Sequence, residues 1–299
     1  MELEPASQPE SFSADGIASP STFIYPQHLR ELAEALPPAP GVYTFHGEAN
    51  HHLPLYIGKS IHVRQRVLSH LRTAQEARML RQTRRFSVIR TAGEVGALLL
   101  EAQLIKTQQP LYNQRLRRSR QLCAWLWHET SSEKPQLVDA RTVPFASTPG
   151  LHGLFASRRA AEAALMTLAD AHQLCHVVLG LEKAPAGKAC FRHQIRRCAG
   201  ACCGAEPTTA HQQRLASALQ TMAVTCWPRP GAVALTETCP LDPQFVQHHV
   251  VRNWYYLGTA STLEQARLLD RTDASFDADS YHILCKPLLL GSLPQTWLN

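Results

Sequence analysis

Short apolar runs separated by polar turns dominate the first third of the chain. The runs "GVYTF" (41–45) and "PLYIG" (54–58) flank the polar segment "HGEANHH", and this arrangement predicts an antiparallel hairpin. A third run, "RRFSVIRTA" (84–92), predicts one more strand. We therefore expect a small antiparallel sheet in this part of the chain.

Helical periodicity surrounds these strands. "QHLRELAEAL" (27–36) predicts a short helix stopped by "PPAPG", and "GEVGALLLEAQLIKTQQP" predicts a helix from about Gly93 that Pro110 ends. Between the strands we expect a helix from about Ile61 to Leu71. It carries an apolar stripe of Val63, Val67 and Leu71 and a polar stripe of His62, Arg66 and His70.

Past the basic segment "RLRRSRQ" the pattern is weaker. Short strands and loops come first, and "SRRAAEAALMTLADAHQL" (157–174) then predicts a helix with Ser157 as its N-cap. A further helix is expected near 208–222, followed by the strand-like run "VQHHVVRNWYYLG". The next predicted helix begins at a capping box formed by Ser261 and Glu264.

The order of these elements predicts an α+β fold. It comprises a small domain with a three-stranded antiparallel sheet flanked by helices, a cysteine-rich metal module and a mixed α+β C-terminal domain. The expected boundaries are 1–25 for a disordered tail, 26–118 for the first domain, 119–174 for a linker or small mixed domain, 175–204 for the cysteine module and 205–299 for the C-terminal domain.

Composition is that of a globular protein, with 44% hydrophobic and 18% charged residues. The sequence offers no apolar run near the length that a membrane span needs. Its N-terminus is acidic and polar, whereas a secretory signal is basic and then apolar. We therefore expect a cytoplasmic protein with reduced thiols.

The distribution of charge says more than the net charge of +6. Residues 1–55 hold seven acidic residues and a single Arg, whereas residues 56–120 hold fourteen Lys or Arg and three Glu. The second segment therefore has a net charge of +11, more than the excess of the whole chain. Such a density favours a polyanion partner such as nucleic acid over an ordinary solvated face.

Glu101 is an acidic residue in an apolar setting. Its neighbours three and four positions away on the predicted helix are all apolar: Ala97, Leu98, Leu104 and Ile105. A carboxylate there is costly to desolvate unless a cation meets it. The cation could be a basic side chain, or a divalent metal such as Mg²⁺ or Mn²⁺ that phosphate and water also coordinate.

Two tyrosines complete a possible catalytic group. A phenol has a pKa near 10, so it is a poor base unless positive charge stabilises the phenolate. Lys59, close to Tyr56, and a metal at Glu101 could supply that charge. Tyr43 would face the same site if the hairpin pairs as predicted, and Arg66 would be free to pair with phosphate oxygens.

At these residues the sequence resembles the GIY-YIG nucleases. "GVY" (41–43) followed by "YIG" (56–58) is similar to their paired motif, with Val42 in place of the usual Ile. Lys59 directly follows the second motif, and Arg66, Glu101 and Asn113 match the supporting positions. Within the family, the resemblance is to the amino-terminal half of the excinuclease C subunit and, more closely, to the short Cho-type excinucleases of nucleotide excision repair.

The resemblance implies a fold, an activity and a set of roles. One metal ion would lie on Glu101, while Arg66 and Lys59 steady the phosphate and Asn113 positions the site. Tyr43 or Tyr56 would activate the attacking water. His70 stands where the excinuclease C pattern usually has tyrosine, so the base is one of Tyr43, Tyr56 and His70.

Five cysteines lie within a short segment of the expected cysteine module: Cys175, Cys190, Cys198, Cys202 and Cys203. In a reduced compartment this density favours a metal site over buried free thiols, and all-thiolate ligation fits either zinc or an iron–sulfur cluster. The excinuclease C family carries a similar four-cysteine pattern after its nuclease domain. The resemblance thus implies a [4Fe–4S] cluster on the first four cysteines, with Cys203 as the spare and intervening arginines facing DNA.

The C-terminal region carries fewer signals. "RTDASFDADSY" places Asp273, Asp277 and Asp279 close together, which we interpret as a solvated loop and not as a second metal site. Full-length excinuclease C subunits carry a second nuclease and further modules, for which 299 residues leave no room. We therefore expect one active site and one incision.

The sequence thus predicts a metal-dependent DNA endonuclease that hydrolyses one bond 3′ to a lesion after excinuclease A and excinuclease B mark the damage. Its expected partners are damaged double-stranded DNA and the helicase-like excinuclease B, with neither a membrane nor a small-molecule substrate. The expected DNA contacts are Arg64, Arg72, Arg84, Arg85, Arg115, Arg117, Arg118, Arg196 and Arg197. The alternatives are a stand-alone structure-selective or mobile-element nuclease, and a catalytically silent DNA-binding protein.

Overall fold

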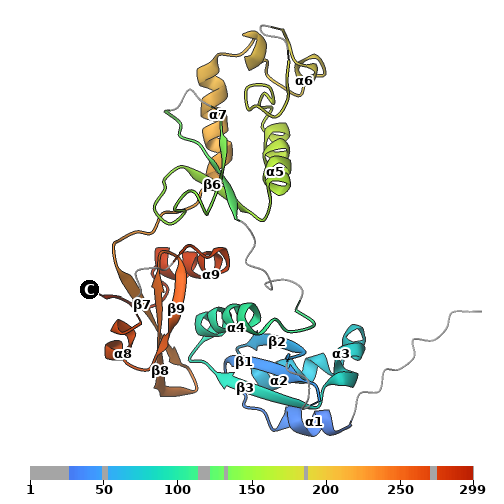
Figure 1. Ribbon diagram of the computed structural model, residues 1–299, viewed down its shortest axis with the longest axis vertical. Helices are drawn as coiled ribbons and strands as arrows, with labels where there is room; N and C mark the ends of the chain where they lie inside the picture. Colours follow the sequence, from blue (N-terminus) through green and yellow to red (C-terminus); the bar gives the residue numbers. More distant parts are fainter. Residues whose placement is uncertain are drawn as a thin grey trace, which may run out of the picture.

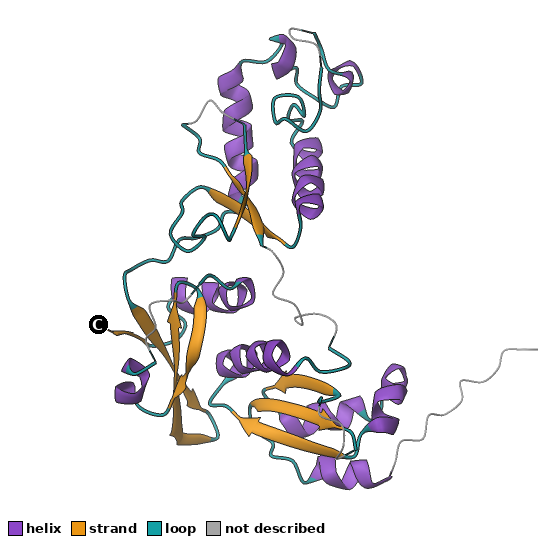
Figure 2. Cartoon of the chain, in the orientation of Figure 1, coloured by secondary structure: helices purple, strands orange, loops and turns teal. Residues whose placement is uncertain are grey.

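The structure is a computed structural model that describes residues 27–48, 53–113, 122–130, 134–184, 188–269 and 275–298. The predicted disordered tail lies outside these residues. Helices and strands occur together along the described chain, as the α+β prediction requires (Figure 2). Among the described helices, none has the length and apolar character needed to cross a membrane.

The first part of the chain is built on a three-stranded antiparallel sheet in the order β2-β1-β3. Strand β1 (Gly41–His46) is central, between β2 (Tyr56–Ser60) and β3 (Arg85–Arg90), and all three match the predicted strands. Tyr43 and Phe45 alternate with Val42 along β1, so β1 is buried on both of its faces. Both faces of this small sheet therefore need a cover of helices.

Helices cover the two faces unequally. Helices α1 (Gln27–Glu34), α2 (Val63–His70) and α3 (Ala77–Gln82) pack on the face of Tyr43 and Phe45. Helix α4 (Glu94–Gln108) packs on the other face through a cluster of Val42, Ile57, Ala97 and Ile105. Gln109, in the left-handed conformation, ends α4 just before Pro110, as the sequence predicts.

The middle of the chain forms a lobe that extends away from the other two parts (Figure 1) and shares a core cluster with the C-terminal part through Ala124 and Leu151. Its sheet has the order β5-β4-β6, from β4 (Cys123–Leu126), β5 (Gln136–Asp139) and β6 (Leu151–Phe155). Helices α5 (Arg158–Ala171) and α7 (Thr208–Gln220) pack on it through residues such as Leu165 and Leu215. The hydroxyl of Ser157 accepts from the Ala160 N–H, which confirms the predicted N-cap. Short helix α6 (Phe191–Gln194) lies among the cysteines.

The C-terminal part has a four-stranded sheet in the order β10-β7-β8-β9. Its strands are β7 (Ala232–Cys239), β8 (Asp242–Arg252), β9 (Tyr255–Ala260) and β10 (Gln295–Leu298), accompanied by helices α8 (Leu263–Arg267) and α9 (Ala278–Leu289). The predicted strand-like run is in fact a hairpin, because Asn253 and Trp254 both have positive φ and turn the chain between β8 and β9.

The predicted capping box lies one residue too early. Thr262, not Ser261, is the N-cap of α8, and its hydroxyl accepts from the Gln265 N–H at 3.2 Å. The Gln265 side chain in turn accepts from the Ser261 N–H at 3.2 Å. Thr262 therefore provides the cap, and Gln265, at the third helical position, returns a hydrogen bond to the residue before the N-cap.

Helix α4 lies between the first sheet and the C-terminal sheet (Figure 1). While Ala97 and Ile105 face the first sheet, Leu99 belongs to the core cluster of Trp254 and Tyr281 in the C-terminal part. The helix is consequently apolar on two sides. Helix α4 therefore joins the first and last parts of the described chain.

The interpretation of the C-terminal aspartates as a solvated loop is wrong for the two that the structure describes. Lys106 on α4 places its ammonium 2.5 Å from Asp277 and 2.7 Å from Asp279. Asp277 is also the N-cap of α9, because its carboxylate accepts from the Ser280 N–H at 3.0 Å. The basic partner is far away in sequence, and Asp273 lies outside the described residues.

Candidate active site

The hairpin brings the two tyrosines to one face of the first sheet. Tyr43 pairs with Gly58 and Phe45 with Tyr56, so Tyr43, Phe45 and Tyr56 all point the same way. The rings of Tyr43 and Tyr56 have centroids 6.3 Å apart. A Cβ at Gly58 would lie 2.4 Å from the Tyr43 hydroxyl oxygen. Glycine is therefore needed at this position to make room for the Tyr43 phenol.

His70 extends this group into a chain of polar contacts. Its Nε2 lies 2.7 Å from the hydroxyl of Tyr43, and its Nδ1 lies 2.5 Å from a carboxylate oxygen of Glu76. The imidazole is only 2% exposed, so the predicted polar stripe of α2 is wrong at this position. Burial is tolerated because both ring nitrogens have partners and the ring packs edge-on against Tyr43 and Tyr56.

Glu76 is a site residue that the sequence reasoning missed. It lies in a 3₁₀ turn (Ala74–Glu76) after α2, where no helical periodicity leads to it. One signal could have found it, because Glu76 is one of only three acidic residues between positions 56 and 120.

Arg66 projects from α2 beside the tyrosines. Its guanidinium lies beside the Tyr43 hydroxyl, and this interaction raises the pKa of Arg66. The residue is otherwise exposed. One side of the fork-shaped group is thus held in place while its other N–H groups remain open to an anion.

Glu101 is half-buried on α4, and its burial raises the pKa of the carboxyl group. The charge of Lys59, the Lys59 backbone N–H and the charge of Arg66 oppose this rise. The Lys59 ammonium itself pairs with Glu94, 2.6 Å away. Glu101 thus lies near the Lys59 backbone and long-range positive charge, while the nearest ammonium is held by another acid.

The tyrosines lie in a setting that keeps them neutral. Burial raises the pKa of Tyr43 and of Tyr56, and the charge of Glu101 raises the pKa of Tyr56 further. Arg66 acts in the opposite direction on both, but it does not overcome burial. The protein's own charges therefore do not produce a phenolate, and any ionisation requires additional positive charge at the site.

Asn113 acts on the site through the backbone of β2. Its side-chain oxygen accepts from the Ile57 N–H at 2.9 Å, and its side-chain nitrogen donates to the Ile57 carbonyl at 2.8 Å. Ile57 lies between Tyr56 and Gly58. The amide therefore fixes the strand that carries the "YIG" motif.

The predicted DNA-contacting arginines differ in their surroundings. Arg64 donates to the Leu36 carbonyl at 2.6 Å, and Arg84 pairs with Glu48 at 2.6 Å, so both help to hold the fold. Arg72 and Arg85 are exposed, and Arg196 and Arg197 are exposed in the middle lobe. Contact with DNA remains a prediction for all of these. The remaining three, Arg115, Arg117 and Arg118, lie outside the described residues.

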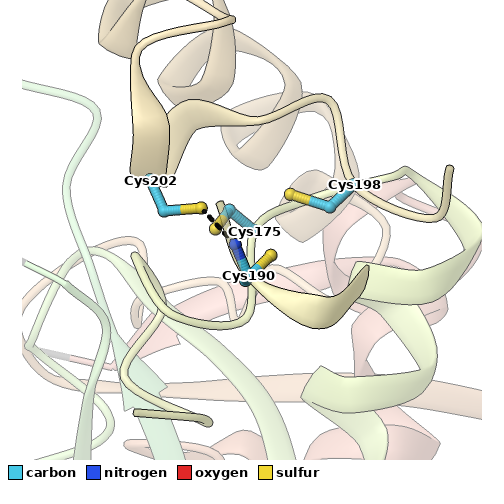
Figure 3. Close-up of side chains that lie close together, drawn as sticks. All are labelled: Cys175, Cys190, Cys198 and Cys202. Carbon is cyan, nitrogen blue, oxygen red and sulfur yellow. Dashed lines mark hydrogen bonds between the residues drawn. The ribbon is translucent and has the colours of Figure 1, made fainter. Parts of the chain in front are cut away.

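Four cysteines of the middle lobe converge on one point (Figure 3). The sulfur atoms of Cys175, Cys190, Cys198 and Cys202 all lie within 4.8 Å of one another. The first three are buried, and the thiol of Cys203 instead donates to the Gly200 carbonyl at 3.3 Å. Backbone N–H groups of Cys190 and Gly200 donate to sulfurs of this group, as they commonly do around metal-bound thiolates.

Burial raises the pKa of Cys198 and of Cys202 to about 12. Neighbouring thiols add to this effect in both cases, because four adjacent thiolates would repel one another. A bound cation would remove that repulsion and release the protons. The arrangement therefore fits a metal centre, and no other cluster of this kind occurs in the part of the chain that the structure describes.

We expected the arginines between the cysteines to face DNA. Arg192 differs from this expectation, because it does not face solvent. Its Nε donates to Glu182 at 2.8 Å, and its Nη1 donates to Asp170. Both acids also flank the fully buried His176. Arg192 is therefore part of an ion network that supports the cysteine loop from behind.

Comparison with known families assigns the three parts of the chain. The UvrC-like GIY-YIG domain matches residues 39–114, the middle domain of UvrC/Cho excinucleases matches 122–221, and the C-terminal domain of excinuclease Cho matches 232–297. The sheet with its paired "GVY" and "YIG" strands therefore defines a nuclease of the GIY-YIG class.

Individual relatives agree with this assignment along almost the full length. Excinuclease cho of Escherichia coli K12 is 55% identical over 277 residues, which is 93% of this chain and 92% of the relative. Excinuclease cho of Salmonella typhi is 55% identical over 90% of this chain and 89% of its own. This chain belongs to the excinuclease Cho family, and it is an endonuclease.

More distant relatives cover parts of the chain. UvrABC system protein C of Natronomonas pharaonis is 32% identical over 64% of this chain and 32% of its own. The GIY-YIG endonuclease domain of Thermotoga maritima UvrC, solved with its catalytic divalent cation, is 32% identical. That match covers 30% of this chain and 99% of the solved domain, with a TM-score of 0.28.

Replacing Arg66 by Ala is expected to slow DNA cleavage by about a hundred- to a thousandfold, the usual loss for one donor to a developing oxyanion. The single-turnover cleavage rate at saturating DNA is the measurement. Gln65→Ala, at the exposed position next to it, is the matched control and should keep the wild-type rate. An Arg66→Ala rate within about threefold of wild type would remove Arg66 from the reaction.

Proposed function

We propose that this excinuclease is a metal-dependent DNA endonuclease that makes one incision on the 3′ side of a lesion, after excinuclease A and excinuclease B have marked the damage. The observation that carries the proposal is that Tyr43, Tyr56, Arg66 and Glu101 lie close enough together in a basic domain to shift one another's pKa values. A protein that only bound DNA would have no need of a buried carboxylate facing a polyanion.

The residues around Glu101 suit a single divalent ion. Mg²⁺ is commonly held by one or two carboxylates, with water and substrate phosphate in the other positions. Glu101 offers a carboxylate whose burial makes an isolated negative charge costly, so a cation beside it is favourable. When bound there, Mg²⁺ or Mn²⁺ would act as a Lewis acid and offset charge on the phosphate.

The remaining residues have complementary tasks in this proposal. Arg66, anchored on Tyr43, directs its free N–H groups at the phosphate oxygens. Tyr43 or Tyr56, in the ionised form that the positive charge of a bound cation would favour, would accept a proton from the attacking water. When the Tyr43 oxygen takes up this proton, the resulting phenol can pass a proton to Nε2 of His70. Nδ1 of the same ring is held by Glu76.

The four cysteines of the middle lobe form a second metal centre in this proposal, distinct from the reaction site. Thiolates about 2.3 Å from one tetrahedral Zn²⁺ would lie roughly 3.8 Å apart, which is compatible with sulfurs within 4.8 Å of one another. A [4Fe–4S] cluster is bulkier and would require the sulfurs to move apart. The four-cysteine pattern of the excinuclease C family still favours the cluster, and we retain it as the proposed occupant.

The neighbourhood of this centre supports a role in binding DNA. Arg196 and Arg197 are exposed between Cys190 and Cys198, so an ordered centre would fix the loop that presents them. The proposal includes a cytoplasmic location, because the DNA substrate lies there. A stand-alone nuclease remains the alternative enzyme, and against it the described residues contain no recognisable helix-turn-helix or zinc-finger reader of DNA.

A lesion-bearing duplex labelled at each end in turn is expected to give one product, from the 3′ side only. Purified protein with Mg²⁺ should produce it when excinuclease A and excinuclease B are present and not when excinuclease B is omitted, because targeting is assigned to excinuclease B. Undamaged duplex is the control. Robust partner-free cutting of that duplex would favour the stand-alone nuclease, and an additional 5′ product would contradict the single-incision proposal.

A further inference from the structure

The amino-terminal end of α4 lacks a capping side chain of its own. Its N-cap residue is Gly93, which makes no side-chain hydrogen bond to the first turn. The open N–H groups of this turn are instead bound by Glu237 on β7, in the C-terminal sheet. One carboxylate oxygen accepts from the Val95 N–H at 3.0 Å, and the other accepts from the Gly96 N–H at 2.7 Å. Glu237 is thus a cap supplied from about 140 residues away.

Glu237 is itself held firmly. The residue is only 6% exposed, and Nε2 of His249 on β8 lies 2.9 Å from its carboxylate. His249 is fully buried, with Nδ1 2.8 Å from the Thr259 hydroxyl on β9. Three neighbouring strands therefore fix one carboxylate at the positive end of α4, where a negative charge is favourable.

The contact leaves no room for a side chain at two positions at the start of α4. A Cβ at Gly93 would lie 2.4 Å from a carboxylate oxygen of Glu237, and a Cβ at Gly96 would lie 2.4 Å from the His249 ring. Gln247 adds a third contact by accepting from the Ala92 N–H at 2.8 Å. The "GEVG" segment is thereby shaped to receive the C-terminal hairpin β7–β8.

The capped turn is linked to the active site through Lys59. Glu94, in the first turn of α4, binds the Lys59 ammonium at 2.6 Å. The backbone of Lys59 in turn lowers the pKa of Glu101, two turns further along the same helix, and α4 packs directly on β2 through Ala97 and Ile57. A shift of the first turn would therefore reach Glu101 both through the helix and through β2.

We propose that Glu237 is a positioning residue for the reaction: by capping α4 from the C-terminal sheet, it holds Glu101 where a divalent ion can be bound. The inference rests on the proposed function, which makes Glu101 the metal ligand. It gives the C-terminal domain a direct part in the chemistry of the first domain, although no residue of the C-terminal domain is placed in the site.

The test is the metal dependence of cleavage by full-length variants. Loss of a cap weakens the start of a helix, so Glu237→Ala is expected to raise the half-saturating Mg²⁺ concentration about three- to tenfold. Glu237→Gln keeps the shape and one acceptor oxygen, and its value should lie between wild type and Glu237→Ala. A purely structural role would instead lower the amount of active protein without changing the half-saturating concentration.

Matched controls come from the same two strands. Thr236 and His248 bond to each other at 2.9 Å on the opposite face of the sheet, away from α4. Thr236→Ala and His248→Ala should therefore keep the wild-type half-saturating Mg²⁺ concentration. If the controls shift as much as Glu237→Ala does, the effect is general destabilisation and the positioning role is rejected.

Glu101→Ala in the same assay distinguishes a failure of the proposed metal site from a failure of the positioning role of Glu237. If it still cuts with the wild-type requirement for Mg²⁺, the site at Glu101 is wrong and the positioning role is rejected with it. If Glu101→Ala is inactive but both Glu237 variants keep the wild-type half-saturating concentration, the proposed function stands and only the positioning role is rejected.

Discussion

Glu101→Ala is expected to abolish DNA cleavage in Mg²⁺ or Mn²⁺ while leaving DNA affinity nearly unchanged. The change removes the carboxylate proposed to bind the metal but leaves the basic surface, and phosphate contacts supply most of the affinity. Cleavage of an end-labelled duplex gives the rate, and fluorescence anisotropy with the same duplex gives the dissociation constant. The loss should reach the detection limit, beyond the hundred- to thousandfold loss roughly expected for Arg66→Ala.

Two further variants make this test specific. Glu101→Gln keeps the volume and the contact with the Lys59 backbone but has no negative charge, so it should be as inactive as Glu101→Ala. Gln103→Ala, at an exposed position on the same helix, should cut at the wild-type rate. Appreciable cutting by Glu101→Gln in Mg²⁺ would mean that the charge is not required, and the metal assignment would fail.

Cys198→Ser is expected to lose the metal of the middle lobe and much of that lobe's stability. A structural metal site contributes its binding free energy directly to folding, so the midpoint of thermal unfolding should fall by more than about 10 °C. Protein purified without oxygen should be brown and contain iron and sulfide in nearly equal amounts, whereas the variant should be colourless. Loss of the centre should also weaken DNA binding and its dependence on salt, because Arg196 and Arg197 would no longer be held in place.

Cys203→Ser provides the comparison for this experiment. Its thiol binds the Gly200 carbonyl and not the other sulfurs, so the variant should retain its metal. Colourless wild-type protein with one tightly bound zinc would replace the cluster by Zn²⁺ and keep the four-thiolate site. Metal-free wild-type protein with full stability would reject a metal centre altogether.

Local patterns predicted much of the fold. Alternating apolar residues located the strands of the first sheet, and helical periodicity with Pro110 located α4. The turn between β8 and β9 was missed because Asn253 is followed by Trp254, whereas a two-residue turn with positive φ usually has Asn before Gly. A bulky residue in such a turn is held by tertiary packing, here in the core cluster with Tyr281.

For the candidate site too, the sequence predicted some of the residues and missed others. The paired tyrosines, Arg66 and Glu101 follow from short motifs, and the structure brings them to one place. Periodicity placed His70 on the polar stripe of its helix, but it does not reveal that both ring nitrogens find partners inside the protein. Glu237 could not be found at all from local sequence, since its partners on α4 are separated from it by the whole middle lobe.

The sharing of α4 between two sheets has a consequence for how the molecule unfolds. Val95 and Leu99 would be exposed to water if the C-terminal sheet left, and Ala97 and Ile105 would be exposed if the first sheet opened. Neither half can therefore melt without uncovering apolar surface on the other, and the two behave as one cooperative unit. Ala124 and Leu151 of the middle lobe belong to the same core cluster as Trp254, so only the far side of that lobe, around Leu165 and Leu215, has a core of its own. Local opening is therefore expected to begin at that far side, while the near side of the middle lobe opens together with the two ends of the chain.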